Sequence, residues 1–235
     1  PEGVLATIAA HMAEVMTESL PETDAGTLSR VALEDGVLEK ITAGKSVVAL
    51  GPGISRDRET AELVRTMFHR FSVPLILDAD GLNAFEGHDA ELRGTENVVI
   101  VTPHLGEMAR LTGNDITYML RNRLEVARQF ALEHEVYVVL KGFRSIVASP
   151  AGTVFVNSTG NAGMATAGSG DILTGMITGI LGQPNLGNFE ERLCLAVYLH
   201  GLAGDIAASE LGEESLVATD ILGFLPQAWR KLRDE

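Results

Sequence analysis

Residues 160–175 read GNAGMATAGSGDILTG, a run of glycines, alanines and small hydroxyl residues that contains one carboxylate, Asp171. Side chains this small bury little surface, so the stretch suits a place where a ligand must approach the backbone closely. From Ile172 onward, apolar residues recur at helical spacing, which places Asp171 in the first turn of a buried helix. A glycine loop that leads into a helix N-terminus presents free N–H groups and the positive end of the helix dipole to an anion. The pattern therefore favours a phosphate-binding loop.

A simpler explanation of the same residues is that Asp171 caps the helix and that Gly175 and Gly179 only allow tight helix packing. Capping alone does not require the small residues that precede Asp171. The stretch is not a Walker loop either, because the G-x-x-x-x-G-K-[ST] order is absent. A carboxylate beside a phosphate site adds repulsion unless it takes part in the chemistry. We therefore expect Asp171 to act as a general base toward a substrate hydroxyl.

Two shorter motifs carry polar side chains at the ends of expected elements. VLKGFRS (139–145) puts Lys141 at a strand end, where it could face a nucleotide or be an exposed lysine before a turn glycine. TPHLGEMARL (102–111) puts His104 at a helix start, with Glu107 three residues later. His104 could bind a substrate, but spacing alone favours a structural histidine, with Glu107 as a first-turn carboxylate that matches the helix dipole.

A metal site and a hydrolytic triad both find little support. Asp78 and Asp80, in ILDADGLNAF (76–85), can be explained as turn residues, and no His or Cys accompanies them at ligand spacing. We assign no metal site built by the protein and expect instead a Mg²⁺ ion that bridges nucleotide phosphates. The sequence has no G-x-S-x-G elbow, and its one cysteine, Cys194, lies in an apolar, helix-like run. These features argue against a hydrolase.

The elements that must position these residues alternate along the chain. Four apolar runs predict strands buried on both faces of a parallel sheet: 46–50, 74–77, 97–101 and 136–140. A hairpin is predicted at 145–149 and 153–157, and helices at 3–19, 27–40, 58–70, 104–112, 115–134, 170–182, 189–210 and 215–233. Polar or glycine residues follow all four parallel strands: Gly51, Gly53, Asp78, Asp80, His104, Glu107, Lys141 and Gly142. Ligands bind beyond the carboxyl ends of strands in open α/β sheets, so the sequence predicts a site at this edge.

Composition limits the remaining possibilities. The chain has 235 residues, of which 46% are hydrophobic, which suits one α/β domain with a sizeable core. Its formal net charge is -14 and no cluster of Lys and Arg stands out, so we expect no nucleic-acid partner. We find no signal peptide and no apolar run long enough to span a membrane, and a single cysteine fits a reducing compartment. We therefore expect a cytoplasmic protein.

The motifs, in order, resemble the NAD(P)H-hydrate dehydratase family, which uses ADP or ATP. The resemblance rests on GPG (51–53), LDADGLN (77–83), TPHLGEMARL (102–111), LKG (140–142) and above all GNAGMATAGSGDILTGMITGIL (160–181). It implies a ribokinase-like α/β fold, in which a central, mostly parallel sheet is flanked by helices on both faces. It also implies a reaction in which hydrated NADH or NADPH, called NAD(P)HX, is phosphorylated on its hydroxyl and loses phosphate to restore NAD(P)H.

The resemblance assigns roles to residues that match the family motifs. Asp171 is the implied catalytic base, and Gly53, His104 and Asp171 are the implied contacts of the hydrated nicotinamide. ADP or ATP, with Mg²⁺, is assigned to Lys141, Gly142, Phe143, Arg144, Ser145, Asn161, Ala162, Gly163, Met164, Ala165, Thr166, Ala167, Gly168, Ser169 and Gly170. A homo-oligomer is implied as well, together with an NAD(P)HX epimerase as a partner or fused domain.

The chain departs from the family pattern at its start. Family members carry an earlier strand and a glycine-containing substrate loop before the point that corresponds to Pro1. We therefore expect residues 1–235 to form a single ribokinase-like catalytic domain that lacks this strand and loop. Two other functions fit the same residues: a ribokinase-like kinase of a small alcohol or vitamin precursor, and a non-catalytic nucleotide-binding module. The sequence does not choose between ADP and ATP, or between NADHX and NADPHX.

Overall fold

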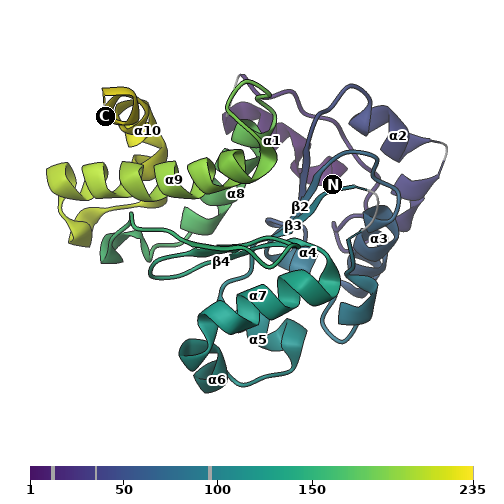
Figure 1. Ribbon diagram of the computed structural model, residues 1–235. Helices are drawn as coiled ribbons and strands as arrows, with labels where there is room; N and C mark the ends of the chain where they lie inside the picture. The colour runs from purple at the N-terminus through teal and green to yellow at the C-terminus, as the bar shows by residue number, and fades with distance from the viewer. Residues whose placement is uncertain (12–13, 35, 95–96, 235) are drawn as a thin grey trace.

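The computed structural model describes residues 1–11, 14–34, 36–94 and 97–234, and Figure 1 shows their arrangement. A six-stranded sheet lies at the centre, and its strands follow one another in space in the order of the sequence. The strands are β1 (Val48–Leu50), β2 (Leu75–Leu77), β3 (Val99–Val101), β4 (Tyr137–Leu140), β5 (Ile146–Ala148) and β6 (Val154–Val156). All six predicted strands are therefore present, each slightly shorter than predicted.

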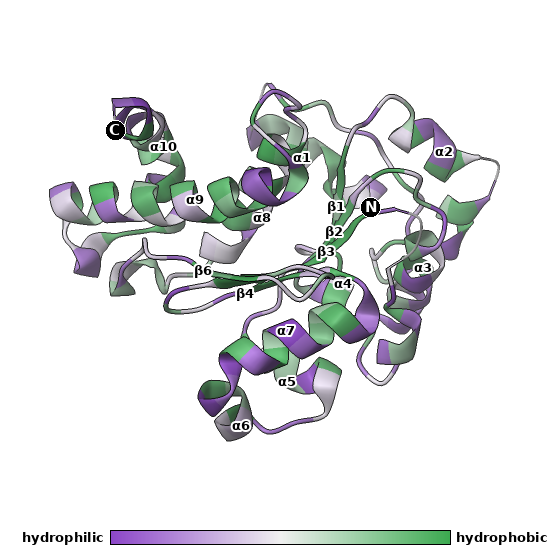
Figure 2. Ribbon diagram, viewed as in Figure 1, coloured by the Kyte–Doolittle hydropathy of each residue, from purple (hydrophilic) through white to green (hydrophobic). Residues whose placement is uncertain are grey.

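Strands β1 to β4 are parallel, and β5 and β6 complete the sheet in antiparallel fashion. The predicted hairpin is confirmed, because Ala148 pairs with Val154 across the turn at Pro150–Gly152. The parallel strands are β-branched and leucine-rich at consecutive positions because both faces of the sheet are covered. Figure 2 shows these strands as a hydrophobic layer at the centre of the molecule.

Helices that connect the parallel strands cover one face of the sheet. Crossovers between parallel strands are right-handed, and here each strand is added on the same side of the one before it, so the connecting helices share one face. They are α3 (Arg58–Phe68), α4 (Asp80–Asn83), α5 (Leu105–Thr112), α6 (Ile116–Arg121) and α7 (Arg123–His134), with a 3-10 turn at Asp89–Glu91. Leu63, Phe85, Met108 and Phe130 belong to the hydrophobic cluster on this face.

Three later helices cover the opposite face. These are α8 (Ser169–Leu181), α9 (Phe189–Leu211) and α10 (Ala218–Asp234), with short 3-10 turns at Ala162–Met164 and Glu213–Ser215. Their buried residues join Ile76, Ile100 and Val139, the strand residues whose side chains point the other way. Helices therefore flank both faces of a mostly parallel sheet, as predicted.

The predicted helix at 115–134 is two helices, because the chain leaves helical geometry at Asn122 (φ −124°, ψ 25°). The side-chain amide of Asn122 donates to the Tyr118 carbonyl at 3.0 Å, an interaction that competes with the helical backbone pattern. The other long helices begin and end within a few residues of their predicted bounds.

The first 45 residues differ most from the prediction. Helix α1 spans only Leu5–His11 after a 3-10 turn at Glu2–Val4, and residues 14–19 are not helical. No side chain of α1 is buried by the described chain, so no tertiary packing supports a longer helix. The predicted helix at 27–40 is a 3-10 turn (Arg30–Leu33) followed by α2 (Val37–Thr42), separated where Gly36 takes a left-handed φ of 69°. Residues 12, 13 and 35 of these two predictions lie outside the described residues.

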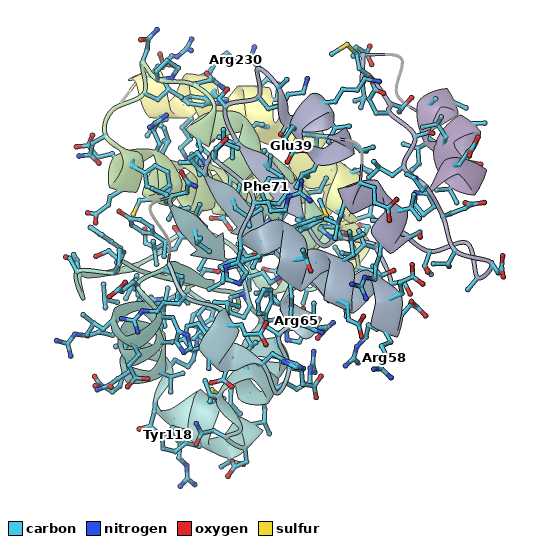
Figure 3. The ribbon with its side chains drawn as sticks, turned by 90° about the vertical axis from the view of Figure 1, so that its right-hand side faces the viewer. Glu39, Arg58, Arg65, Phe71, Tyr118 and Arg230 are labelled. Atoms are coloured by element: carbon cyan, nitrogen blue, oxygen red, sulfur yellow. The ribbon has the colours of Figure 1, made fainter. Side chains whose placement is uncertain are left out.

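Arginines on and beside α3 make polar contacts with neighbouring groups, and the side view in Figure 3 labels two of them on α3, Arg58 and Arg65. Arg58 contacts Glu62 at 3.1 Å, and Arg70 contacts Glu39 at 2.5 Å. Arg65 also donates to the Ala84 carbonyl at 2.6 Å, which ties α3 to the segment after β2. Within the described residues, no helix has the length and apolar character needed to cross a lipid bilayer.

Candidate functional site

The carboxyl ends of β1 to β4 lie side by side at one edge of the sheet, as the sequence predicted. Pairing continues beyond β3 and β4 through a bridge between His104 and Lys141, and the Lys141 amide donates to the Pro103 carbonyl at 2.8 Å. His104, the N-cap of α5, and Lys141, at the end of β4, are thus held next to each other. This alignment brings two of the sequence motifs to one place.

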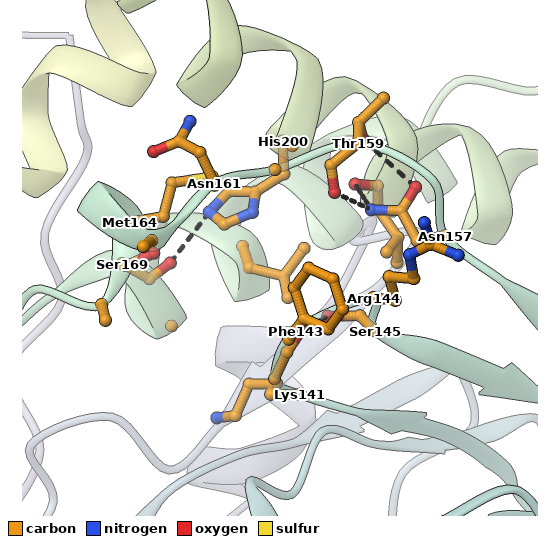
Figure 4. A pocket seen from close by; sticks show the side chains of 18 of the residues that line it. Lys141, Phe143, Arg144, Ser145, Asn157, Thr159, Asn161, Met164, Ser169 and His200 are labelled. Atoms are coloured by element: carbon orange, nitrogen blue, oxygen red, sulfur yellow. Dashed lines mark hydrogen bonds between the residues drawn. The ribbon is translucent and has the colours of Figure 1, made fainter. Parts of the chain in front are cut away.

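A cavity of about 600 Å³ opens between this edge and the layer of α8 and α9. Such a volume is typical of a nucleotide or cofactor site. Figure 4 shows the cavity from close by. Its lining includes many of the residues predicted to bind a nucleotide or substrate: His104, Lys141, Gly142, Phe143, Arg144, Ser145, Asn161, Ala162, Met164, Ala165, Thr166, Ser169 and Gly170.

Lys141 is held in a buried ionic cluster at the base of the cavity. Its ammonium group lies 2.6 Å from Oδ1 of Asp78 and 3.7 Å from Oε2 of Glu107. The other carboxylate oxygen of Asp78 accepts a bond of 2.6 Å from the Thr174 hydroxyl on α8. Asp78 is 1% exposed, so both of its oxygens are satisfied within the protein. One carboxylate from β2 thereby ties the lysine of β4 to the first turns of α8.

The cluster places a cation beside the N-terminus of α8. A methyl group at Gly170 would lie only 3.4 Å from the Lys141 ammonium, so the lysine reaches the first turn of that helix. The helix dipole presents positive charge to this end of the cavity, and the Lys141 ammonium lies beside it, with its charge partly offset by Asp78 and Glu107. An anion such as a phosphate group is the ligand that this arrangement favours.

His104 has the structural role that spacing alone favoured, and it also lines the cavity. Its Nδ1 accepts from the amides of Gly106 at 2.9 Å and Glu107 at 3.2 Å, while the Glu107 carboxylate accepts from the His104 amide at 2.7 Å. This capping box fixes the tautomer, because Nδ1 must be unprotonated to accept. Nε2 therefore carries the proton, and the half-exposed side chain can present it to a ligand.

The strand-end turn 141–145 has a conformation that Arg123 stabilises. Gly142 has a φ of 146°, and Arg144 has a left-handed φ of 52°. The guanidinium of Arg123 donates to the Phe143 carbonyl at 2.7 Å and contacts the Arg144 carbonyl at 3.4 Å. Burial lowers the pKa of Arg123. The turn leaves the Phe143 ring 76% exposed at the cavity, where an aromatic ring can stack on a nucleobase.

Five of the predicted site residues are not in the cavity lining. Asp171 is exposed in the first turn of α8, directly after the lining residue Gly170. Ala167 and Gly168 precede that turn, and Gly163 packs against the backbone of Glu213. Gly53 sits after β1 with a left-handed φ of 69° and open space around it. The structure thus brings twelve of the fifteen predicted nucleotide residues into one lining, together with His104, and leaves Gly53 and Asp171 outside it.

Sequence reasoning missed a second group of lining residues, which come from the segment after β6, from α8 and from α9. They are Asn157, Thr159, Gly160, Leu173, Val197, His200 and Gly201. The available signal was the run HGLAGD (200–205), in which His, Asp and two glycines share one face of an apolar helix. That face of α9 points toward residues 160–169, and α9 forms one wall of the cavity.

The explanation of Gly175 and Gly179 as packing glycines is wrong. A methyl group built at either position would meet no other part of the described chain within 4 Å. Tight packing is instead required at Gly201 and Gly204 of α9, where a methyl group would collide with Thr159 and Met164. Cys194, also on α9, is partly buried, and burial raises the pKa of its thiol to about 11, so it is no nucleophile at neutral pH.

Comparison with known proteins agrees with this geometry. A family model described as NAD(P)H-hydrate dehydratase matches residues 2–227. The chain belongs to the NAD(P)H-hydrate dehydratase family. It is 46% identical over 238 residues to the "Bifunctional NAD(P)H-hydrate repair enzyme Nnr" of Moorella thermoacetica, and this match covers 100% of the chain and 44% of the relative. The chain therefore spans about half the length of that relative.

A monofunctional relative and its structure point the same way. The "ADP-dependent (S)-NAD(P)H-hydrate dehydratase" of Bacillus subtilis is 33% identical over 184 residues, which are 78% of the chain and 64% of that protein. The structure of the ADP/ATP-dependent NAD(P)H-hydrate dehydratase from Bacillus subtilis, co-crystallised with ATP and Mg²⁺, superposes with a TM-score of 0.77 at 27% identity. The match covers 98% of this chain and 76% of that one. The fold is ribokinase-like, as the sequence motifs implied.

Proposed function

We propose that this member of the NAD(P)H-hydrate dehydratase family restores NADH or NADPH from its hydrated form at the expense of ADP or ATP. The observation that carries the proposal is the cavity in which Lys141 and the N-terminus of α8 converge, with Asp171 beside it. Relatives across most of the chain are named for this repair reaction. Because the chain spans about half the length of the Moorella thermoacetica relative, the proposal concerns the reaction at this cavity.

The nucleotide is proposed to occupy the cavity along the predicted set of residues. Its phosphates would meet the loop 161–170 and Lys141, and its base would lie toward Phe143, Arg144 and Ser145. Backbone N–H groups and one lysine suffice to position phosphates in such sites. Gly163, Ala167 and Gly168 would then support the loop rather than touch the ligand, since they do not line the cavity.

Asp171 is proposed as the base and His104 as a donor to the substrate. Asp171 would take the proton of the substrate hydroxyl while the hydroxyl oxygen attacks the terminal phosphorus of the nucleotide. ADP then leaves if the donor is ATP, and AMP leaves if the donor is ADP. The phosphate then departs with the electrons of its bond to the ring carbon, and the neighbouring carbon loses a proton as the double bond forms. The His104 Nε2–H and the open turn at Gly53 would contact the hydrated ring from the sheet edge.

Mg²⁺ is proposed to arrive with the nucleotide. The cavity lining drawn from the described residues contains no carboxylate, and those residues include no cluster of three or more metal-ligating side chains. A magnesium ion held mainly by phosphate oxygens and water fits this donor set. Asp171 directly follows the lining residue Gly170, at the N-terminus of α8, and we propose it as the carboxylate that would face such an ion.

Four predictions about the wider protein remain proposals. Both hydrophobic clusters share one sheet, which supports a single catalytic domain over residues 1–235. The Moorella thermoacetica relative is named bifunctional, which supports a second activity in the longer protein, and we propose an NAD(P)HX epimerase as the partner or fused domain. The lone Cys194 supports a cytoplasmic location. A homo-oligomer is inferred from the family resemblance and is testable by light scattering of the purified protein.

The experiment is the conversion of NADHX and NADPHX, followed at about 340 nm, where the restored cofactor absorbs. ADP and ATP are supplied in parallel with Mg²⁺, to this chain and to a version extended at its N-terminus. Nucleotide-dependent recovery of absorbance supports the proposal and identifies the donor. Asp171→Asn should retain nucleotide affinity while turnover falls by orders of magnitude, and Asp234→Asn, at the exposed end of α10, is the matched control.

Two results would redirect the assignment. Nucleotide binding without turnover of either hydrate by either version would favour a kinase of another small alcohol, and phosphorylation of such an alcohol would establish it. Nucleotide binding with no transfer to any hydroxyl compound would favour the non-catalytic module. Equal turnover by Asp171→Asn and the unmodified protein would remove Asp171 from the role of base.

A further inference from the structure

The segment 160–169, which we call the nucleotide loop, is tied to helix α9 at both ends. At its start, Asp205 accepts from the Gly160 amide through Oδ2 at 2.8 Å and from the Asn161 side-chain amide through Oδ1 at 3.0 Å. At its end, Nε2 of His200 donates to the Ser169 carbonyl at 3.1 Å, the bond drawn as a dashed line in Figure 4. Both tying side chains come from one face of α9, five residues apart.

The nucleotide loop and Thr159, the residue before it, lie directly on the backbone of α9. A methyl group at Gly201 would collide with Thr159, and one at Gly204 would collide with the Met164 side chain. Thr159 is held there by a bond of 2.8 Å from its hydroxyl to the Tyr198 carbonyl. The path of the nucleotide loop is therefore specified by α9 through contacts that need no ligand.

Asn161 relays the first tie into the loop. Its Nδ2 donates to Asp205, while its Oδ1 accepts from the Gly163 amide at 3.0 Å and begins the 3-10 turn Ala162–Met164. A flip of the amide would lose both bonds, so the carboxylate of Asp205 fixes the orientation of Asn161 as well as the position of Gly160. Asp205 is part-buried, where an unpaired carboxylate would be costly.

We propose that Asp205 and His200 are positioning residues that hold the nucleotide loop in its ligand-receiving shape before any nucleotide binds. The identity of the ligand rests on the proposed function, but the ties do not. Preorganisation of this kind raises affinity because the ordering of the loop is already complete in the free protein. Asp205 is not assigned to contact the nucleotide or the reacting atoms.

The proposal can be tested by whether neutralisation of Asp205 weakens or strengthens nucleotide binding. Asp205 is a negative charge next to a proposed phosphate site in a chain of net charge -14. If charge alone mattered, Asp205→Asn would tighten nucleotide binding, because it removes a repulsion. If Asp205 positions the loop, the same change weakens binding, because the new side-chain amide would face the donor of Asn161. We expect the affinity for ADP and ATP to fall about tenfold.

The experiment is a pair swap with two readouts. The variants Asp205→Asn, Asn161→Asp and the two combined are compared for ADP and ATP affinity by calorimetry and for amide exchange of residues 160–169 without nucleotide. Each single change should speed exchange and weaken binding. The combined change should recover most of the exchange protection, because the new amide at 205 can donate to the new carboxylate at 161, whose other oxygen still accepts from Gly163. Nucleotide affinity should stay low, because a carboxylate then lines the proposed phosphate site. Glu210→Gln, exposed on the same helix, controls for loss of charge.

The second tie has its own matched pair. His200→Gln retains a donor that can reach the Ser169 carbonyl, whereas His200→Leu fills similar space without one. We expect the glutamine variant to keep loop protection near Ser169 and most of the nucleotide affinity, and the leucine variant to lose both. Equal behaviour of the two variants would overturn the role of His200 as a donor to the loop.

The outcomes separate this inference from the proposed function. Tighter binding by Asp205→Asn with unchanged exchange of the nucleotide loop would overturn the positioning role of Asp205. A combined variant whose loop exchanges as fast as that of the worse single variant would overturn it as well. If the unmodified protein binds neither nucleotide, the proposed function fails, and the exchange rates of the variants alone decide whether the ties hold the loop.

Discussion

Asp78 is a buried carboxylate that connects three elements around the candidate site. Its two oxygens bind Lys141 and Thr174, so a single buried carboxylate joins β2, β4 and α8. A buried ion pair of this kind contributes little net stability when intact, but removal of one partner leaves an uncompensated charge. The position of Lys141, which is proposed to meet the phosphates, therefore depends on Asp78, a buried side chain that does not line the cavity.

The hydroxyl of Thr174 offers a direct test of this cluster. Thr174→Val leaves one oxygen of buried Asp78 without a partner, and we expect the free energy of unfolding to fall by about 1–3 kcal/mol. Thr174→Ser keeps the bond and should cost less than half as much. Urea denaturation measures both values. Equal losses in the two variants would show that the bond to Asp78 contributes no more to stability than the packing of the methyl group does.

His200 should make stability depend on pH. Burial lowers its pKa from the ordinary 6.5 to about 4, although its bond to the Ser169 carbonyl acts in the opposite direction. Between these two values the unfolded chain binds more protons than the folded one, so stability rises with pH, is fully present above pH 6.5, and is lost as the pH falls toward 4. The loss amounts to about 3 kcal/mol. We expect urea denaturation of His200→Gln to show a smaller loss from pH 7 to pH 4 than the unmodified protein; parallel curves would contradict the shift.

At the scale of elements, helices α8 and α9 use glycine for opposite reasons. Gly175 and Gly179 of α8 face open space within the described chain, whereas Gly201 and Gly204 of α9 lie against the nucleotide loop. A helix-interior glycine without close neighbours costs stability through backbone entropy. The same residue under a packed loop cannot be replaced without moving the loop.

Alanine substitutions should therefore have opposite signs in the two helices. Gly175→Ala and Gly179→Ala should each raise the free energy of unfolding by up to about 1 kcal/mol. Gly201→Ala should lower it by about 1–3 kcal/mol and weaken nucleotide binding, because its methyl group collides with Thr159. Thermal and urea denaturation of the three variants, with ADP titrations, decide the point. A destabilised Gly175→Ala would mean that another part of the protein covers α8.

The sequence predicted the elements that carry strong local signals. The four buried strands, the glycine loop and α8 were predictable because consecutive β-branched residues, small residues and helical periodicity each have one structural explanation. The break at Asn122 and the early end of α1 were not, since they depend on side-chain competition and on missing tertiary contacts. Asp78, His200 and Asp205 acquire their importance only when β2, β4, α8 and α9 meet in space, which no local pattern reports.

At the scale of the whole molecule, the sheet separates two hydrophobic layers that come from different parts of the chain. Residues before 149 supply the cluster on one face, and helices after residue 168 cover the other. Ile76, Ile100, Val139 and Val147 of the sheet are buried only by these later helices. The nucleotide cavity lies where the later layer meets the strand ends, so it needs both parts.

A chain ended at residue 160 should keep the first layer and expose the second face of the sheet. We expect it to bind a hydrophobic fluorescent dye strongly and to aggregate, because four large apolar side chains of the strands lose their cover. Dye fluorescence and light scattering measure this against the full chain. A monodisperse fragment that binds no dye would show that residues up to 160 fold without leaving an apolar sheet face exposed.

The order of the strands also sets the order of events during synthesis. The ribosome completes all six strands before it adds the first residue of α8, and it then needs several seconds, at about 5–20 residues per second, to deliver α8 and α9. During that interval the nascent sheet has one bare apolar face and no cavity. A ligand of the cavity can therefore bind only after α8 and α9 have covered the sheet, so it cannot stabilise a chain that stalls before them.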